Sequence, residues 1–504
     1  MAFFIYYNLP GVHPMKQSDS TAYKKSVSTA GSLAVTLRIG VFFDGTGNNR
    51  INSQIGADCR ALAETYHHAH IKECGGRHLD PHSSYSSELT NIALLADLYR
   101  QQPAAKNNGG GLMAFHAIYV SGVGTTSGGR DSLISGQSFG RGQTGVVAKV
   151  VKGVKKIARV LHGFEAHNPG CVIAGLELDL FGFSRGAAAA RHLANEVLKQ
   201  QAGLLEGILN RRTLPLSPTC TWANGRIRLK VIGLFDTVAA VGGITDMGRV
   251  SDSANKRVNL FLPPGCADHV IQLVAGDEQR RNFSLNSISP GWMIEITVPG
   301  AHSDVGGGYP PQARENVFLT RPRRSLVRLS TRSEDTDAWR DAQAELETLD
   351  ASRWLDPRDI DGRIRVVCWE HHLHSSSSMK EVWAAVSLER VVFGHLSGVY
   401  LRLMHALSTE QGVPFEPVPA SVFASVPPEL RGIAATLIEQ GRAGKISLTE
   451  QEALVLSRRY VHRSAHWNAM AGKSGAWGDS FFIHAPAEGG RVRFPNCEQP
   501  GYPQ

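Results

Sequence analysis

Ser184 stands in the pentapeptide Gly182-Phe-Ser-Arg-Gly186, the Gly-x-Ser-x-Gly pattern that places a serine nucleophile on a sharp turn. The apolar run 176–183 before it predicts a strand, and the alanine-rich run after it predicts a helix. A serine at such a junction can attack an ester carbonyl when a base removes its proton. The backbone N–H of Arg185, at the start of the helix, is the expected first oxyanion donor. A tightly packed turn without chemistry is the alternative interpretation.

The base and its orienting acid are expected further along the chain, in the order serine, acid, histidine. Asp236 follows the apolar run 227–235, and His302 follows the run 292–298, so each comes at the end of a predicted strand. We therefore predict a Ser184–Asp236–His302 triad. Asp236 could instead cap the next helix, and His302 could be an ordinary loop histidine.

Other residues compete for two of these roles. Asp304 is the main alternative acid, although it could instead hold the glycine-rich turn around it through an Asx-type bond. His462 and His466, close together near the end of the chain, are alternative bases.

A second oxyanion donor is expected in a loop after an early strand. The turn Asp44-Gly-Thr-Gly47 follows such a strand, so the amides of Gly45 and Thr46 are the candidates. Asp44 could orient this loop or bind a metal. A plain turn is the alternative.

The elements needed to hold these residues alternate along the chain. Strands are predicted at 35–43, 115–120, 176–183, 227–235 and 292–298, and helices at 146–161 and 187–199. Alternating strands and helices predict an α/β fold with a mostly parallel sheet flanked by helices. Functional side chains gather beyond the carboxyl ends of such strands. The α/β-hydrolase fold, with a helical cap or insertion, is the expected architecture.

Four segments are expected. Residues 1–32 are polar and predict an N-terminal arm, and residues 33–310 form the catalytic core. Residues 311–455 are charged at first and predict a partly helical insertion or cap, which could face a membrane, with a helix between 337 and 350. Residues 456–504 return to the core and end in a hairpin over 481–494.

Composition excludes several classes of protein. The chain has 504 residues and a formal charge of +8, with neither a basic block nor zinc-finger spacing, so no nucleic acid partner is expected. Its seven cysteines are scattered without a CxxC pair, so a disulfide framework is not expected. We expect neither a signal peptide nor a membrane span. It predicts no cofactor and no metal site, and it leaves metal dependence open.

Several stretches together resemble the phospholipase effectors of the bacterial type VI secretion system, and specifically their first group, whose hydrolase domain was long catalogued as a domain of unknown function. The matching stretches are Phe42-Phe-Asp-Gly-Thr-Gly-Asn-Asn49, Gly182-Phe-Ser-Arg-Gly-Ala187, Gly233-Leu-Phe-Asp-Thr-Val238, Pro299-Gly-Ala-His-Ser-Asp-Val-Gly-Gly-Gly-Tyr309 and Tyr460-Val-His-Arg-Ser464. They span most of residues 35–310 and part of the C-terminal region.

This resemblance implies a Ser184–Asp236–His302 triad that hydrolyses acyl esters of membrane glycerophospholipids, as a phospholipase of the A1 or A2 type. It implies synthesis in the bacterial cytoplasm without a signal peptide, followed by delivery to the periplasm of a rival cell. The implied partners are the secretion spike or tube proteins and a cognate immunity protein. A carboxylesterase for small soluble esters and a non-catalytic binding module with a hydrolase fold are the competing interpretations.

Overall fold

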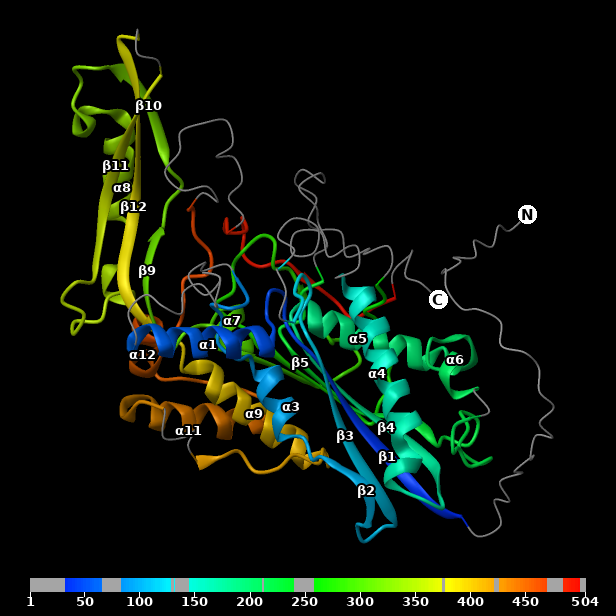
Figure 1. The fold of residues 1–504 in the computed structure, drawn as a ribbon. Helices are drawn as coiled ribbons and strands as arrows, with labels where there is room; N and C mark the ends of the chain where they lie inside the picture. The colour runs from blue at the N-terminus through cyan, green and yellow to red at the C-terminus, as the bar shows by residue number, and fades with distance from the viewer. Residues whose placement is uncertain are drawn as a thin grey trace, which may run out of the picture.

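The fold is described from a computed structural model (Figure 1). It describes residues 32–65, 83–127, 131, 145–210, 213–239, 258–373, 377–420, 426–468 and 484–498. The N-terminal arm expected over residues 1–32 therefore lies almost wholly outside the described residues.

A seven-stranded sheet forms the centre of the molecule, in the order β2-β3-β1-β4-β5-β6-β8. All neighbouring pairs are parallel except β2–β3, which is antiparallel. The five predicted strands are confirmed, while β2 and β6 were not predicted. The bounds are β1 Leu33–Phe43, β2 Gln102–Asn107, β3 Leu112–Val120, β4 Cys171–Phe183, β5 Ile227–Phe235, β6 His269–Ala275 and β8 Ile294–Val298.

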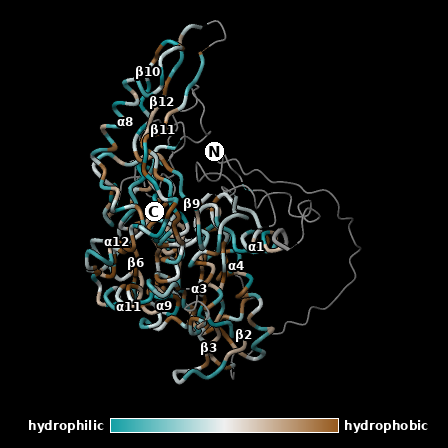
Figure 2. The backbone as a smooth tube through the Cα atoms, turned by 90° about the vertical axis from the view of Figure 1, so that its left-hand side faces the viewer, coloured by the Kyte–Doolittle hydropathy of each residue, from teal (hydrophilic) through white to brown (hydrophobic). Residues whose placement is uncertain are grey.

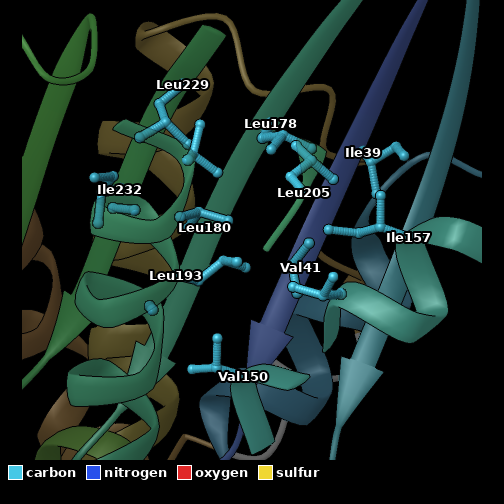
Figure 3. Close-up of a cluster of buried hydrophobic side chains, with 14 of the residues drawn as sticks. Ile39, Val41, Val150, Ile157, Leu178, Leu180, Leu193, Leu205, Leu229 and Ile232 are labelled. Atoms are coloured by element: carbon cyan, nitrogen blue, oxygen red, sulfur yellow. The ribbon is translucent and has the colours of Figure 1, made fainter. Parts of the chain in front are cut away.

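Helices cover both faces of this sheet, as the alternation of strands and helices predicts. On one face lie α4 (Val146–His167) and α5 (Arg185–Leu198), whose apolar side chains share a core with β1, β4 and β5. Figure 3 shows Val150 and Leu193 from these helices pointing toward the strands. The other face packs against α3 (Asn91–Leu98), α9 (Leu396–Glu410) and α11 (Pro428–Arg442). The sheet is thus buried on both sides, which explains its nearly continuous apolar strands.

A second, antiparallel sheet occupies residues 312–393. It comprises β9 (Gln312–Phe318), β10 (Arg323–Arg328), β11 (Arg363–His372) and β12 (Met379–Phe393), and α8 (Asp337–Glu347) packs on it. The predicted helix is confirmed in α8, and the antiparallel sheet beside it was not predicted. Figure 1 shows this sheet standing off the body as an arm, and Figure 2 shows β2 and β3 at the opposite end of the molecule.

The remaining elements are short or lie around the body. They are α1 (Arg50–Thr65), α6 (Glu206–Leu209), α7 (His302–Gly306), α12 (Glu450–Arg459), β7 (Leu285–Asn286), β13 (Arg493–Phe494) and the 3-10 turns Gln200–Ala202, Ser333–Asp335 and Ala351–Arg353. The expected C-terminal hairpin lies partly outside the described residues. Within them, β13 pairs in parallel with β7, so this segment joins the body rather than folding on itself.

Composition led us to expect neither a disulfide framework nor a membrane span. Cys59 on α1 is disulfide-bonded, a bond that the scattered cysteines did not indicate. Sequence spacing does not reveal which cysteines meet after folding. Cys171, Cys220, Cys266, Cys368 and Cys497 are free. Within the described ranges, no helix has the length and apolar character needed to cross a membrane.

Candidate active site

Ser184 occupies a strained turn between a strand and a helix. It follows the last residue of β4 and precedes the first of α5, with φ 58° and ψ −125°. A positive φ is rare for a residue with a side chain and is typical of a nucleophile elbow. The Ser184 N–H donates to the Phe235 carbonyl at 3.0 Å, which fixes the turn against the end of β5.

The glycines on either side of Ser184 allow backbones to approach closely. A Cβ atom on Gly182 would lie 2.4 Å from the Gly186 carbonyl oxygen, and one on Gly186 would lie 2.2 Å from the Phe43 carbonyl oxygen. Neither position has room for a side chain. The Gly-x-Ser-x-Gly pattern is therefore a packing requirement here, which brings the start of α5 against the end of β1.

Asp236 and His302 meet in the interior. Asp236 follows β5 and His302 begins α7, and the His302 Nδ1 lies 2.5 Å from the Asp236 Oδ2. Asp236 is fully buried and His302 is 4% exposed. The Asp236 backbone has φ 44°, a second strained residue at the same edge of the sheet. An Asp–His pair of this kind fixes the ring orientation and the tautomer of the histidine.

Ser184 lies beside this pair. Phe183 and Phe235 are register partners on β4 and β5, so Ser184 and Asp236 leave adjacent strands at the same level. The His302 ring lies 4.6 Å from the Phe183 ring, measured between centroids. Across the described part of the chain, no hydrogen bond joins the Ser184 hydroxyl to His302. Catalytic hydrogen bonds are often long before substrate binds.

Arg491 is a further site residue that the sequence did not indicate. Its Nη1 and Nη2 donate to the Asp236 Oδ1 and Oδ2, both at 2.8 Å. Burial alone would raise the pKa of Asp236. The Arg491 charge and the His302 hydrogen bond outweigh burial and hold that pKa well below its usual range. Asp236 is therefore ionised at any physiological pH.

His302 is held by aromatic and polar contacts. Phe283 packs against the His302 ring edge to face at 4.9 Å, and Phe183 packs on it from β4. The His302 N–H donates to the Glu278 Oε2 at 3.3 Å. Burial lowers the pKa of His302 below its usual value, and Asp236 opposes this only in part. The ring is thus a neutral base near pH 7.

The loop after β1 is fixed around the carboxylate of Asp44. This carboxylate accepts hydrogen bonds from the Gly45 N–H at 2.7 Å, the Thr90 hydroxyl at 2.7 Å and the Tyr119 hydroxyl at 2.5 Å. Burial raises the pKa of Asp44, and these donors oppose that effect. Asp44 therefore orients the loop, which is one of the two roles considered for it.

The two proposed oxyanion donors of this loop are not equivalent. The Gly45 N–H is already bonded to Asp44. The Thr46 N–H has no acceptor within the described ranges, and the Thr46 hydroxyl accepts from the Arg185 Nε at 2.6 Å. This last bond ties the loop to the residue that follows Ser184.

The alternative acid, Asp304, and the alternative bases, His462 and His466, contact residues other than Ser184, Asp236 and His302. Asp304 Oδ1 is 2.7 Å from the His462 Nδ1, and Asp304 Oδ2 accepts from the N–H groups of Ala301 and His462, both at 2.9 Å. Asp304 thus holds His462 and the start of α7, and it makes no bond to His302. The His466 ring packs on His484 at 4.4 Å, and burial lowers its pKa to about 4.

No metal-binding group is evident in the described residues, where no three histidine, cysteine or carboxylate side chains cluster suitably. The acid, the base and the strained serine instead converge at the carboxyl ends of β4, β5 and β8. This is the edge of a parallel sheet where ligands bind in α/β proteins. The arrangement suits nucleophilic attack on a carbonyl carbon.

Comparisons with known proteins identify relatives of this chain. The sequence model of a family described as "T6SS, Phospholipase effector Tle1-like, catalytic domain" matches residues 217–331, which include Asp236 and His302. A solved structure described as "Structure of the Tle1 effector bound to the VgrG spike from the Type 6 secretion system" is 31% identical to this chain with a TM-score of 0.68. The match covers 92% of this chain and 94% of that one.

A crystal structure of an uncharacterized protein from Pseudomonas aeruginosa is 19% identical, with a TM-score of 0.37, and covers 84% of this chain and 53% of that one. That score is too low to support an argument about fold. No curated protein matches the chain. The similarity to the Tle1 effector extends over nearly the whole of both chains, and the chain therefore belongs to the Tle1-like phospholipase effectors of the type VI secretion system.

Proposed function

We propose that this chain is a serine phospholipase of the A type, which hydrolyses acyl esters of membrane glycerophospholipids. The observation that carries the proposal is the buried Asp236–His302 pair at 2.5 Å beside Ser184 on its strained turn. Membership of a phospholipase effector family makes a lipid ester the substrate that fits this arrangement best.

In the proposed reaction, the His302 Nδ1–H donates to Asp236, which leaves Nε2 as the ring nitrogen that accepts the Ser184 proton. The Ser184 oxygen then bonds to the ester carbonyl carbon, and the carbonyl oxygen becomes an oxyanion. Collapse of this intermediate breaks the ester bond, and His302 returns the proton to the departing lysophospholipid. Water, activated by the same histidine, releases the fatty acid from the serine.

The oxyanion is proposed to bind the backbone N–H groups of Arg185 and Thr46. Arg185 begins α5, so the partial positive charge of the helix N-terminus reinforces its amide. Asp44 places Thr46 by holding the Gly45 amide next to it. The Gly45 amide itself takes a supporting role in this proposal.

The proposed architecture is the α/β-hydrolase fold, with residues 33–310 as its catalytic core. Residues 311–455 are proposed as an insertion that supplies the arm and the core helices α9 and α11. Residues 456–504 are proposed to complete the core, because Arg491 reaches Asp236 from this segment. The order serine, acid, histidine along the chain agrees with this fold.

The proposed setting follows from the relatives. The similar Tle1 structure is described as bound to the VgrG spike, so we propose that this chain also associates with a spike protein. Delivery to the periplasm of a rival cell would give it access to membrane phospholipid. A cognate immunity protein is proposed to protect the producing cell.

Mass spectrometry of lipids after incubation with phospholipid vesicles tests the proposal. The wild type should release fatty acid and lysophospholipid, and Ser184→Ala should reduce the rate by several orders of magnitude, leaving only the catalysis supplied by oxyanion contacts. Ser408→Ala is a matched control, because Ser408 is buried in α9 and its hydroxyl has no partner among the described residues. Full activity of Ser184→Ala would refute the serine mechanism.

Two further measurements separate the competing interpretations. A fluorophosphonate probe should label the wild type and not Ser184→Ala, because only an activated serine reacts; absence of labelling would favour a binding module. A panel of short soluble esters should be hydrolysed more slowly than vesicle phospholipid. The reverse preference would favour a carboxylesterase.

A further inference from the structure

We propose that Arg491 is a positioning residue of the active site, which holds the Asp236 carboxylate in the orientation that His302 requires. This inference rests on the proposed function, because it assigns Arg491 a role in the same triad. Arg491 would not touch the substrate. It would act through Asp236.

The contacts around Asp236 indicate this role. Its Oδ1 accepts from the Arg491 Nη1 at 2.8 Å and from the Ala275 N–H at 3.0 Å. Its Oδ2 accepts from the Arg491 Nη2 at 2.8 Å and lies 2.5 Å from the His302 Nδ1. The guanidinium is the donor group that contacts both oxygens, so it fixes the plane of the carboxylate. A fully buried carboxylate also needs an opposite charge to stay ionised.

Arg491 is itself fixed from several directions. Its Nε donates to the Phe283 carbonyl at 2.6 Å, and its Nη1 also reaches the Ala275 carbonyl at 3.3 Å. The Phe283 ring packs against His302, so the guanidinium also ties down the residue next to the base. Only 7% of the Arg491 side chain is exposed. A long, flexible side chain is thereby held in one geometry.

The chain following Arg491 is anchored to the body. The Leu285 N–H donates to the Val492 carbonyl and the Ser287 N–H to the Phe494 carbonyl, both at 2.9 Å. Asn496, 3% exposed, accepts from the Leu262 N–H at 3.0 Å and donates to the Leu262 carbonyl at 2.9 Å. Residues 491–496 therefore form a strap, and the strap places Arg491 on the acid.

A planar guanidinium and an ammonium should differ in this position. Arginine binds both carboxylate oxygens in fixed geometry, whereas lysine supplies a point charge. Arg491→Lys keeps the charge and loses the two-point contact. Arg491→Ala loses both, so the pKa of Asp236 and the pKa of His302 should rise. The acid limb of kcat/KM should then move to higher pH, because His302 must be neutral to accept a proton.

The test uses the full chain and a soluble short-chain ester, with kcat, KM and the pH profile measured for each variant. Hydrogen-bond partners that orient metal ligands are typically worth about 10- to 100-fold, which we take as the scale for a residue that orients an acid, and loss of a triad carboxylate costs about 10⁴-fold. We expect Arg491→Lys to lower kcat by about 10- to 100-fold with KM and the acid limb unchanged. We expect Arg491→Ala to lower kcat further and to shift the acid limb upward.

Arg493→Ala is the matched control, because Arg493 is exposed on the same strap, and it should behave as the wild type. Wild-type kcat in Arg491→Lys would overturn the inference. It would also be overturned by an Arg491→Ala variant whose acid limb does not move. If Arg491→Ala does not fold, the kcat of Arg491→Lys alone tests the inference. Ser184→Ala, measured in parallel, separates the two hypotheses. Full activity of Ser184→Ala would refute the proposed function. An inactive Ser184→Ala protein together with fully active Arg491 variants would refute only the role proposed for Arg491.

Discussion

The ring of Phe183 sets the distance between the loop after β1 and the helix that carries the base. A Cβ atom on Gly306, the last residue of α7, would lie 2.1 Å from a ring carbon of Phe183, and one on Gly45 would lie 2.4 Å from the same ring. Ordinary contact for a Cβ atom begins at 3.4 Å. His302 stands at the other end of α7. Any shift of this short helix therefore moves the base.

Gly306→Ala should displace α7 or the Phe183 ring by roughly 1 Å, and a displacement of that size can cost about 10²-fold in rate. Overpacking of a buried site should also lower the free energy of unfolding by about 1–3 kcal/mol. Fatty acid release from vesicles measures the first effect, and thermal unfolding with and without the substitution measures the second.

Gly163→Ala is the control for this substitution. Gly163 lies in α4, where an added Cβ atom would meet nothing within 4 Å. It should leave the rate unchanged and raise stability by about 0.5–1 kcal/mol, because alanine favours the helix. A Gly306→Ala protein with wild-type kcat/KM would refute the argument that Phe183 determines the position of the base.

Other predictions concern charged groups. Asp236→Asn should lower kcat by about 10⁴-fold, whereas Asp304→Asn, which loses contacts to His462 but none made directly with His302, should lower the rate far less and act mainly on stability. The proposed mechanism needs neutral His302, and burial lowers its pKa, so the acid limb of kcat/KM should lie at a lower pH than an ordinary histidine would give, which a pH profile checks. Burial lowers the pKa of Lys149 to about 7. The folded state therefore binds fewer protons than the unfolded state between about pH 7 and 10, and stability from this group rises with pH in that range. Lys149→Met removes this pH dependence. The difference in unfolding free energy, Lys149→Met minus wild type, should therefore be larger at pH 7 than at pH 9 by on the order of 2 kcal/mol. Unfolding both proteins at both pH values checks this.

Most strands of the central sheet, and the positions of Asp236 and His302 just after strands, could be predicted because apolar runs and the polar residues that follow them are local signals. Long apolar runs mark β1, β4 and β5, and a polar residue stands directly after each of them. Since parallel strands end at one edge, Ser184 and Asp236 were expected to be neighbours. The glycines that flank Ser184 also follow a local pattern, because they are required by the approach of α5 to β1.

The arm and Arg491 could not be predicted in the same way. The arm sheet buries only a small core against α8, so its strands carry weak apolar periodicity. Arg491 is separated from Asp236 by 255 residues, and an arginine in an otherwise ordinary segment gives no local indication of a distant carboxylate. The same holds for His462, whose pairing with Asp304 depends on tertiary packing.

The strap has a consequence for how the protein is made. A ribosome that has just added Asp236 must add 255 more residues before Arg491 exists to neutralise it. Ser184 is synthesised first, His302 later, and Arg491 last. Because domains begin to fold during synthesis, the nascent chain passes through a long interval in which this carboxylate lacks its cation. Translation order therefore delays completion of the proposed site until nearly all of residues 1–491 have been added.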